Sequence, residues 1–372
     1  MMFPKILPNF CVPGKVSVII DGQFGSTGKG LVASRIAFDN HYDIAVASLS
    51  PNAGHTFYDA DMKKHVTKLL PVTGIMDKRC QIYISADAVI DPKILLKEIE
   101  EFDIDPSRIA IHPRTAIITE KEKQTEQDPN GVKTIASTQS GTGAARSAKI
   151  MRYGILAENY EPLKKYVHKL DLSYYLDNGC SAIVETGQGV DLGINHGLAY
   201  PFCTSRDPSP SYVLGELGLH PKYFGKSIAV FRTFPIRVGN IVENGKEVGY
   251  SGPFWDDSKE ITFSDLNVPD ERTTVTKRIR RIATFSMKQY CHTLRLLQPD
   301  YILLNFVNYY KSDFERLKIR FPKQVRKPTH MGYGPRPQDI TEYDEDALSG
   351  ILKWKKNSLK ILFILNNDWP NS

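Results

Sequence analysis

The sequence predicts an α/β protein in which a central, mostly parallel β-sheet is flanked by helices. Short apolar runs alternate along the chain with longer amphipathic stretches, as is typical of parallel strands joined by crossover helices. A glycine-rich loop directly follows the first apolar run, where α/β proteins commonly hold phosphates. The chain has 372 residues, of which 41% are apolar and 24% charged, the composition of a globular protein with a sizeable core. No linker divides it, so we expect a single large domain over residues 1–372.

Each expected strand is a short apolar run bounded by polar or turn residues. The runs are residues 16–20, 44–47, 81–85, 109–112, 182–185, 228–231 and 301–304. The expected helices carry apolar residues at a spacing of three and four: residues 31–39, 92–102, 161–176 and 275–295. Residues 119–147 are polar and rich in Gly, Ser and Thr, so we expect a long surface loop that serves the substrate. Residues 1–14 precede the first strand as an N-terminal extension.

Composition and charge exclude several classes of protein. The five cysteines are scattered and never form a C-x-x-C pair, so they support neither a disulfide framework nor a zinc site: Cys11, Cys80, Cys180, Cys203 and Cys291. The net charge of +6 suits small anionic substrates and is too diffuse to indicate nucleic acid. No apolar run approaches the roughly 18 residues of a membrane span, and the first residues lack a signal-peptide core. We expect a cytoplasmic protein with no membrane or nucleic-acid partner.

The loop after the first strand has the features of a phosphate site. Gly22, Gly25, Gly28 and Gly30 surround Lys29, and helical spacing begins immediately afterwards. Glycines let the backbone approach an oxyanion, the helix N-terminus supplies free N–H groups, and the lysine adds a positive charge. The loop matches neither the Walker A pattern nor the G-x-G-x-x-G dinucleotide pattern. The type of phosphate ligand therefore stays open, and a tight turn without a ligand is the alternative.

Two further segments place candidate side chains among glycines. Residues 52–56 read Asn-Ala-Gly-His-Thr, and His55 suits proton transfer because the pKa of histidine lies near neutrality. A structural histidine is the alternative. Residues 185–197 carry Gln188, whose amide donates and accepts together and can read the edge of a base. A purely structural glycine turn is the alternative.

A loop of small residues, 137–146, is followed by two cations. Lys149 and Arg152 lie three apart on an expected helix, and with the loop's hydroxyl and N–H groups they suit a second phosphate. A flexible polar loop is the alternative.

Residues 272–281 begin the last expected helix, with Thr273 or Thr274 as its cap. The arginines that follow suit carboxylates or phosphates: Arg278, Arg280 and Arg281. The alternative is a solvated helix face.

Taken in order over about residues 16–336, these elements resemble the adenylosuccinate synthetase family. Residues 23–30 resemble its motif Q-W-G-D-E-G-K-G, residues 52–56 match N-A-G-H-T, and residues 185–189 resemble E-G-A-Q-G. The sequence also resembles the family at Thr204-Ser205, at the aspartate loop that contains Thr273-Thr274, and at Gly334-Pro335. The resemblance implies a P-loop-related fold. It also implies a ligase that joins aspartate to the 6-position of inosinate, with a nucleoside triphosphate and Mg²⁺.

Three departures from the family pattern change the expected substrate. Ser26 stands where the family has an aspartate that removes the N1 proton and helps bind Mg²⁺, and a serine hydroxyl cannot act as that base near neutral pH. Asn305 and about Val307 replace the lysine and aspartate that read the guanine of GTP, which favours ATP or dATP. Thr276 replaces an arginine beside the substrate ribose, which fits a deoxyribose. Asp21 stands where the family has glycine, and we consider it as a replacement for the missing base.

Serine in place of aspartate is the pattern of the family's phage-encoded branch. Enzymes of that branch act on dGMP and form N6-succino-2-amino-2′-deoxyadenylate for diaminopurine DNA, and an uncharged Ser26 leaves room for the 2-amino group of guanine. We expect ATP or dATP to phosphorylate O6 of dGMP, after which aspartate displaces the phosphate. A conventional synthetase acting on IMP and a non-catalytic nucleotide-binding protein are the alternatives. The resemblance also implies a homodimer in which Arg152 reaches the 5′-phosphate across the interface.

The resemblance implies the following site residues. The expected catalytic residues are Ser26, Lys29, His55 (as acid near O6) and Gln188, and the expected Mg²⁺ ligands are Ser26 and the Gly54 carbonyl. ATP is expected to contact Ser26, Thr27, Gly28, Lys29, Gly30, Gly54, His55, Thr56, Arg278, Asn305, Gly334 and Pro335. For dGMP the residues are Ser26, Asn52, Ala53, Thr138, Gln139, Arg152, Gln188 and Thr204. For aspartate they are Thr273, Thr274, Val275, Thr276, Arg278 and Arg280.

Overall fold

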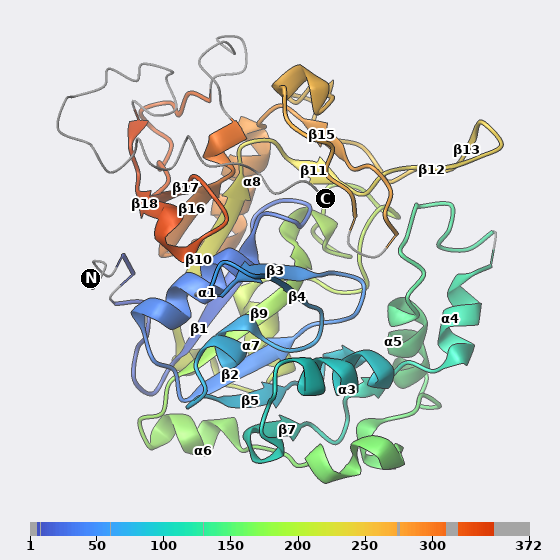
Figure 1. The fold of residues 1–372 in the computed structure, drawn as a ribbon, viewed down its shortest axis with the longest axis vertical. Coiled ribbons are helices and arrows are strands. Elements are labelled where there is room, and N and C mark those ends of the chain that lie inside the picture. Colours follow the sequence, from blue (N-terminus) through green and yellow to red (C-terminus); the bar gives the residue numbers. More distant parts are fainter. Residues whose placement is uncertain are drawn as a thin grey trace.

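A computed structural model describes residues 6–7, 9–59, 61–128, 130–273, 276–309 and 319–345. Its centre is a nine-stranded sheet (Figure 1). In spatial order the strands are β18 (Ile340–Glu342), β17 (His330–Gly332), β16 (Tyr301–Asn305), β10 (Phe224–Arg232), β1 (Val16–Asp21), β9 (Ala182–Gly189), β2 (Ile44–Ser48), β5 (Gln81–Ile84) and β7 (Ile109–Ile111). All neighbours are parallel except β17 and β18. The predicted mostly parallel α/β sheet is confirmed, and all seven expected runs are strands of it.

The remaining described strands form small sheets around the central one. One joins β11 (Ile236–Arg237), β15 (Arg281–Ala283) and β14 (Glu260–Ile261). The others pair β12 (Ile241–Glu243) with β13 (Lys246–Gly249), β3 (His55–Tyr58) with β4 (Lys64–Thr67), and β6 (Val89–Ile90) with β8 (Ala116–Ile117). The described α-helices are α1 (Lys29–Asp39), α2 (Val72–Met76), α3 (Pro92–Glu101), α4 (Glu120–Glu126), α5 (Thr142–Ile150), α6 (Leu172–Asp177), α7 (Pro210–Glu216) and α8 (Met287–Leu297).

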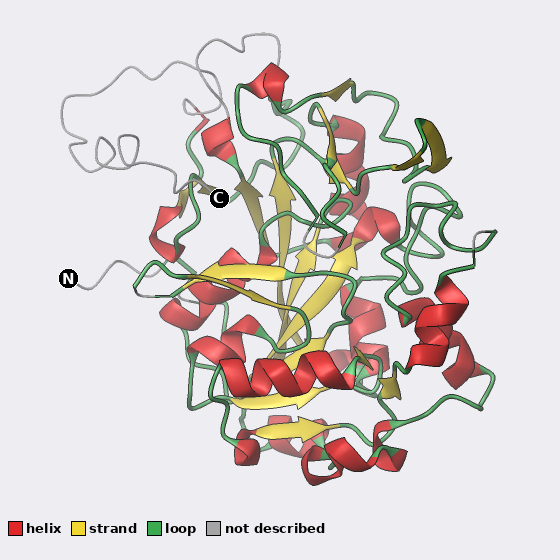
Figure 2. Ribbon diagram, turned by 45° about the vertical axis from the view of Figure 1, so that its right-hand side comes forward, coloured by secondary structure: helices red, strands yellow, loops and turns green. Residues whose placement is uncertain are grey.

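Helices cover both faces of the sheet, which is why its strands are continuous apolar runs (Figure 2). Every residue of β1 is buried. Val16, Val18 and Ile20 point into a cluster that contains residues of α7 and α8, whereas Ile19 packs with residues of α1. The carboxyl end of β1 therefore opens at the centre of the sheet, between the ends of β9 and β10.

Two expected helices are shorter than their apolar spacing suggested. Residues 161–176 form a 3₁₀ segment, Glu161–Tyr166, and then the separate helix α6. Residues 275–295 are helical only from Met287, because the Ser286 hydroxyl caps α8 at Gln289 N–H and residues 281–283 pair as β15 instead. The expected helix cap at Thr273 is therefore wrong, and the alternative cap, Thr274, lies outside the described residues.

The expected surface loop over residues 119–147 is largely ordered by two carboxylates. Glu122 completes a capping box with Thr119 at the start of α4. Glu126 accepts hydrogen bonds from the N–H groups of Gly141, Gly143 and Ala144 at the start of α5. The sequence did not predict α4, because its buried side chains are glutamates and not an apolar face, and it placed the start of the helix that carries Lys149 too late.

The N-terminal extension also packs onto the fold. Leu7 and Phe10 are fully buried beside residues of α1. Within the described part of the chain, no helix has both the length and the apolar character needed to cross a membrane.

Candidate active site

The glycine loop joins β1 to α1 at the carboxyl edge of the sheet. Gly25 and Gly28 adopt positive φ angles of 94° and 89°, and Ser26 between them has φ 57°. Ser26 is exposed at the tip of the loop, whereas Thr27 and Lys29 are buried. Gly28 is the N-cap of α1 and has no side chain to cap the helix. The start of this eleven-residue helix therefore has no side-chain cap, which is compatible with the predicted anion site.

Asp21 lies beneath this loop rather than in reach of a substrate. Its carboxylate is fully buried and accepts hydrogen bonds from the N–H groups of Gln23, Gly25 and Thr27, from the Thr27 hydroxyl, and from Lys29 Nζ. A carboxylate that already accepts five donors is poorly placed to take a substrate proton. The hypothesis that Asp21 replaces the missing base is not supported by this geometry.

Lys29 connects the phosphate loop to the glycine segment after β9. Its Nζ lies 3.3 Å from Asp21 Oδ2 and 3.2 Å from the carbonyl oxygen of Gln188. The Gln188 side chain donates to Asn52 Oδ1 at 3.0 Å, and its φ of 66° turns the chain at the end of the strand. The structure thus brings together three predicted residues from three different strand ends.

His55 begins β3, which lies against the start of α1. A Cβ on Gly30 would collide with the Thr56 carbonyl, so only glycine permits this approach. The His55 ring is 5% exposed, and its Nε2 has no hydrogen-bond partner among the described residues. Burial, and then the charge of Lys29, lower the pKa of His55 to about 3. The ring is therefore neutral in the physiological range.

The Ser26 hydroxyl faces an arginine from the predicted aspartate loop. Arg280 Nη1 donates to Ser26 Oγ at 2.8 Å, and burial lowers the pKa of Arg280. The Ser26 carbonyl accepts from Arg232 Nη1 at 3.1 Å. Arg232 in turn forms a 2.6 Å ion pair with Glu271 and lies 4.0 Å from the centre of the Phe306 ring.

Arg232 and Glu271 were missed by sequence reasoning. Arg232 is the last residue of β10, beside the end of β1, and its side chain is fully buried. The burial of Glu271 would raise its pKa, but the neighbouring arginines reverse that effect and lower it. The sequence could have indicated Arg232 as a site residue, because it follows an apolar run and the ends of parallel strands meet at one edge of a sheet.

Arg278 connects the predicted aspartate loop to the predicted substrate loop. Its Nη2 donates to the carbonyl oxygens of Ala136 and Ser137, at 2.9 and 3.2 Å, and its Nε donates to Thr276 Oγ1 at 3.0 Å. Its Nη1 is buried and has no partner among the described residues. Thr273 Oγ1 accepts from the N–H group of Arg278, which closes a tight loop and not a helix.

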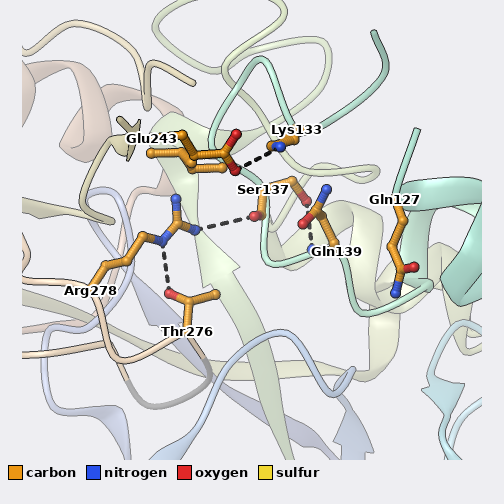
Figure 3. Close-up of a pocket in the computed structure, with 8 residues that line it drawn as sticks. Gln127, Lys133, Ser137, Gln139, Glu243, Thr276 and Arg278 are labelled. Atoms are coloured by element: carbon orange, nitrogen blue, oxygen red, sulfur yellow. Dashed lines mark hydrogen bonds and ion pairs between the residues drawn. The ribbon is translucent and has the colours of Figure 1, made fainter. Parts of the chain in front are cut away.

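Three of the residues just described, Ser137, Thr276 and Arg278, line a cavity of about 340 Å³ (Figure 3). Lys133 and Glu243 also line this cavity, and Glu243 lies on β12. Lys133 Nζ and the Glu243 carboxylate form an ion pair at 2.8 Å. Sequence reasoning missed this pair. The lining residues are Gln127, Lys133, Ser137, Gln139, Ile241, Glu243, Thr276 and Arg278.

Arg278, Arg280 and Arg281 do not share a solvated helix face. Arg278 and Arg280 point to the substrate loop and to Ser26, whereas Arg281 forms an ion pair with Glu260 at 2.6 Å. Val275, predicted to contact aspartate, lies outside the described residues.

Asn305 holds the phosphate loop from the end of β16. Its Nδ2 donates to the Thr27 carbonyl at 3.0 Å, and its amide fits between Gly28 and Gly332, where added Cβ atoms would collide with it. Gly334 and Pro335 follow β17, in a segment that reaches α1 through a hydrogen bond from Arg35 to the Pro337 carbonyl.

The remaining predicted residues are more dispersed. Thr204 joins the β9 loop through a backbone hydrogen bond to Leu192, and Gln139 bonds the Glu126 carbonyl. Arg152 is exposed beyond the end of α5, and among the described residues no hydrogen bond or ion pair joins its side chain to the phosphate loop. Lys149 donates to the Ala86 carbonyl at 2.6 Å, so the expected pairing of Lys149 with Arg152 on one helix is wrong.

A phosphate-binding loop, a buried neutral histidine and converging arginines at one sheet edge define a nucleotide-dependent α/β enzyme. The adenylosuccinate synthetase family model matches residues 18–175 and 156–342. The chain belongs to the adenylosuccinate synthetase family.

The similar proteins within this family include phage enzymes. The N6-succino-2-amino-2′-deoxyadenylate synthase of Salmonella phage PMBT28 is 32% identical over 358 residues, which cover 88% of this chain and 97% of the relative. The adenylosuccinate synthetase of Methanocaldococcus jannaschii is 31% identical over 304 residues, or 80% of this chain and 84% of the relative. The solved structure of the cyanophage S-2L succinoaminodeoxyadenylate synthetase has a TM-score of 0.78 and 32% identity, and covers 90% of this chain and 97% of that protein. The cyanophage enzyme is bound to dGMP and to dATP as an energy donor.

Proposed function

We propose that this enzyme is a ligase that joins L-aspartate to the 6-position of dGMP, with ATP or dATP as energy donor, and forms N6-succino-2-amino-2′-deoxyadenylate. The similarity to the phage synthases, one of which binds dGMP and dATP, supports this substrate pair. The observation that carries the proposal is Ser26. An uncharged side chain stands at the exposed tip of the loop, and a Cβ on the neighbouring Gly25 would meet nothing within 4 Å. This open space accommodates the 2-amino group of guanine.

The first step transfers the γ-phosphoryl group of ATP or dATP to O6 of dGMP, while the N1 proton of guanine passes to water and ADP or dADP leaves. Lys29 and the N–H groups at the start of α1 stabilise the charge on the transferring group. The neutral His55 holds its ring proton, so it can donate a hydrogen bond near O6 without adding a buried charge. Asn52 and Gln188, already joined by a hydrogen bond, orient the purine.

The second step is displacement of the 6-phosphate by the amine of aspartate. The cavity beside Arg278 is proposed to hold the amino acid, because Arg278 is half-buried there and its Nη1, which has no partner among the described residues, can pair with a carboxylate. Thr273 and Thr276, whose hydroxyls lie 2.6 Å apart, keep Arg278 in place. Arg280 contacts the loop tip through its hydrogen bond to Ser26 Oγ.

Mg²⁺ is proposed to bind beside the nucleotide phosphates. Ser26 Oγ and the Gly54 carbonyl are neutral oxygen ligands, which fit a metal that takes its other ligands from phosphates and water. Among the described residues, no group of three or more His, Cys, Asp or Glu side chains could hold a metal by itself. When bound, the ion would neutralise charge on the phosphates.

We also propose that residues 1–372 act as one domain and that two copies form a dimer. The nine-stranded sheet contains both the first and the last described strands, β1 and β18, which supports a single unit. Exposed apolar side chains surround Arg152, namely Ile150, Met151, Tyr153 and Ile155. A second copy that covers this face would place Arg152 at the partner's substrate 5′-phosphate.

A phosphate-release assay tests the function. It combines dGMP, GMP or IMP with ATP, dATP or GTP, each with and without aspartate. We expect fastest turnover with dGMP and with ATP or dATP, and only when aspartate is present. Faster turnover of IMP would instead identify a conventional adenylosuccinate synthetase. No phosphate release with any combination would support a non-catalytic nucleotide-binding protein.

A further inference from the structure

The interior of the phosphate loop contains a carboxylate that none of the proposed steps uses. Asp21 is the last residue of β1 and is fully buried. Its Oδ1 accepts the N–H groups of Gln23 at 2.9 Å and Gly25 at 3.2 Å, and its Oδ2 accepts the Thr27 N–H at 3.1 Å and the Thr27 hydroxyl at 2.6 Å. The three N–H groups belong to alternate residues of the loop. The carboxylate therefore acts as a template around which the loop is wound.

The same carboxylate is the charge partner of Lys29. The side chain of Lys29 is 9% exposed, and its ammonium nitrogen lies 3.3 Å from Asp21 Oδ2. A buried cation without a counter-charge is strongly disfavoured, so Asp21 stabilises Lys29 in the loop before any nucleotide is present. The Gln188 carbonyl, at 3.2 Å, fixes the direction of the ammonium group.

The space around Asp21 leaves little freedom for another arrangement. A Cβ on Gly189, which pairs with Asp21 in the sheet, would lie 2.8 Å from Asp21 Oδ1. The carboxylate is thus held on one side by the loop and on the other by the end of β9. A longer acid at position 21 has no room.

We propose that Asp21 is a positioning residue for nucleotide binding: it holds the phosphate loop in its receptive shape and keeps Lys29 aimed at the phosphates of the donor nucleotide. This inference rests on the proposed function, since it assigns a role in the donor half of that reaction. The loop has no negative charge at its tip, where Ser26 stands. It has one at Asp21, on the opposite side of the loop. There it acts on Lys29 and the backbone instead of on the purine.

Asp21→Asn is the direct test. An amide presents one NH₂ group, and in either orientation that group faces donors: Lys29 and Thr27 on one side, or the N–H groups of Gln23 and Gly25 on the other. We expect the Kd for ATP with MgCl₂, measured by calorimetry without dGMP or aspartate, to rise about 10-fold or more. We expect kcat to fall about 100-fold through misplacement of Lys29. The KM values for dGMP and aspartate should stay near those of the unmodified enzyme.

Asp39→Asn is the matched control. Asp39 is also fully buried, at the opposite end of α1, where it accepts from the N–H groups of Ile6 and Leu7 and from Arg35. This variant should lower the melting temperature and leave ATP binding unchanged. If Asp21→Asn affects ATP binding no more than Asp39→Asn does, Asp21 has only a structural role and the inference is wrong. A loss of kcat with unchanged ATP affinity would also overturn it, because that split would mark Asp21 as the base.

Thr27→Val provides a second variant in case Asp21→Asn does not fold. It removes one hydroxyl donor to Asp21 and keeps the size of the side chain. We expect weaker ATP binding, in the same direction and by a smaller factor, and unchanged ATP binding would count against the inference. ATP binding does not depend on which purine nucleotide accepts the phosphoryl group. The ATP-binding measurements therefore test the role of Asp21 independently of the phosphate-release assay. Turnover of IMP rather than dGMP would overturn the proposed function and leave the role of Asp21 standing.

Discussion

The buried His55 makes the stability of this enzyme sensitive to acid. A histidine has an ordinary pKa of 6.5, and burial together with Lys29 lowers that of folded His55 to about 3. Below pH 6.5 the unfolded chain therefore binds a proton that the folded chain does not. The stabilisation is fully present above pH 6.5 and is lost as the pH falls towards 3.

The magnitude follows from the two pKa values. A pH of 5.0 is 1.5 units below the pKa of His55 in the unfolded chain. This difference corresponds to about 2 kcal/mol of lost unfolding free energy. At pH 7.5 the loss is about zero. Urea unfolding at the two pH values measures it. His55→Gln should lose about 2 kcal/mol less than the unmodified enzyme between pH 7.5 and 5.0.

His196→Gln is the control, because the His196 ring is exposed and remains in water in both states. Its stability should follow that of the unmodified enzyme at both pH values. Equal losses in His55→Gln and the unmodified enzyme would refute the reasoning, since His55 would then carry the same proton in the folded and unfolded chains.

Three other changes have defined outcomes. Ser26→Asp should lower kcat/KM for dGMP and raise kcat/KM for IMP, because a carboxylate at the loop tip pairs with Arg280 and removes the space for a 2-amino group. An unchanged ratio of these two kcat/KM values in the phosphate-release assay would contradict this prediction. Burial, with Asp87 nearby, raises the pKa of Glu216 to about 9, so the folded chain retains a proton that the unfolded chain loses above about pH 4.5. The contribution of Glu216 to the unfolding free energy should therefore fall by about 1.4 kcal/mol per pH unit between pH 6 and 8, and Glu216→Gln should remove this contribution in urea titrations. Met151→Glu should yield monomers in analytical ultracentrifugation and raise the KM for dGMP, because Met151 is 64% exposed beside Arg152; a dimer with unchanged KM would contradict the proposed interface.

The sheet and the phosphate loop could be predicted from the sequence because their signals are local. A strand buried on both faces is a continuous apolar run, and the glycines after β1 stand in a stretch of nine residues. The order of the strands in the sheet could not be predicted from the sequence, because it depends on which apolar runs pair across long loops.

The parts that the sequence did not predict depend on contacts between distant segments. Residues 275–283 have helical spacing, yet Arg281–Ala283 pairs with β11 and β14, and tertiary pairing overrides the local pattern. Asp21 looked like a free carboxylate near Ser26, and only the folded loop shows five donors around it. Arg232 and Glu271 are 39 residues apart, so nothing local indicated their ion pair.

The placement of Asn305 restricts how the donor preference of such an enzyme can evolve. By the sequence resemblance, Asn305 is predicted to stand where the family reads the donor base. The same side chain fastens the phosphate loop through Thr27, with no spare volume beside Gly28 or Gly332. Replacing Asn305 by lysine to recover a guanine donor would therefore disturb the phosphate site at once. The donor-base preference and the geometry of the phosphate loop are therefore epistatic. A lineage that has lost the guanine donor must change both to recover it.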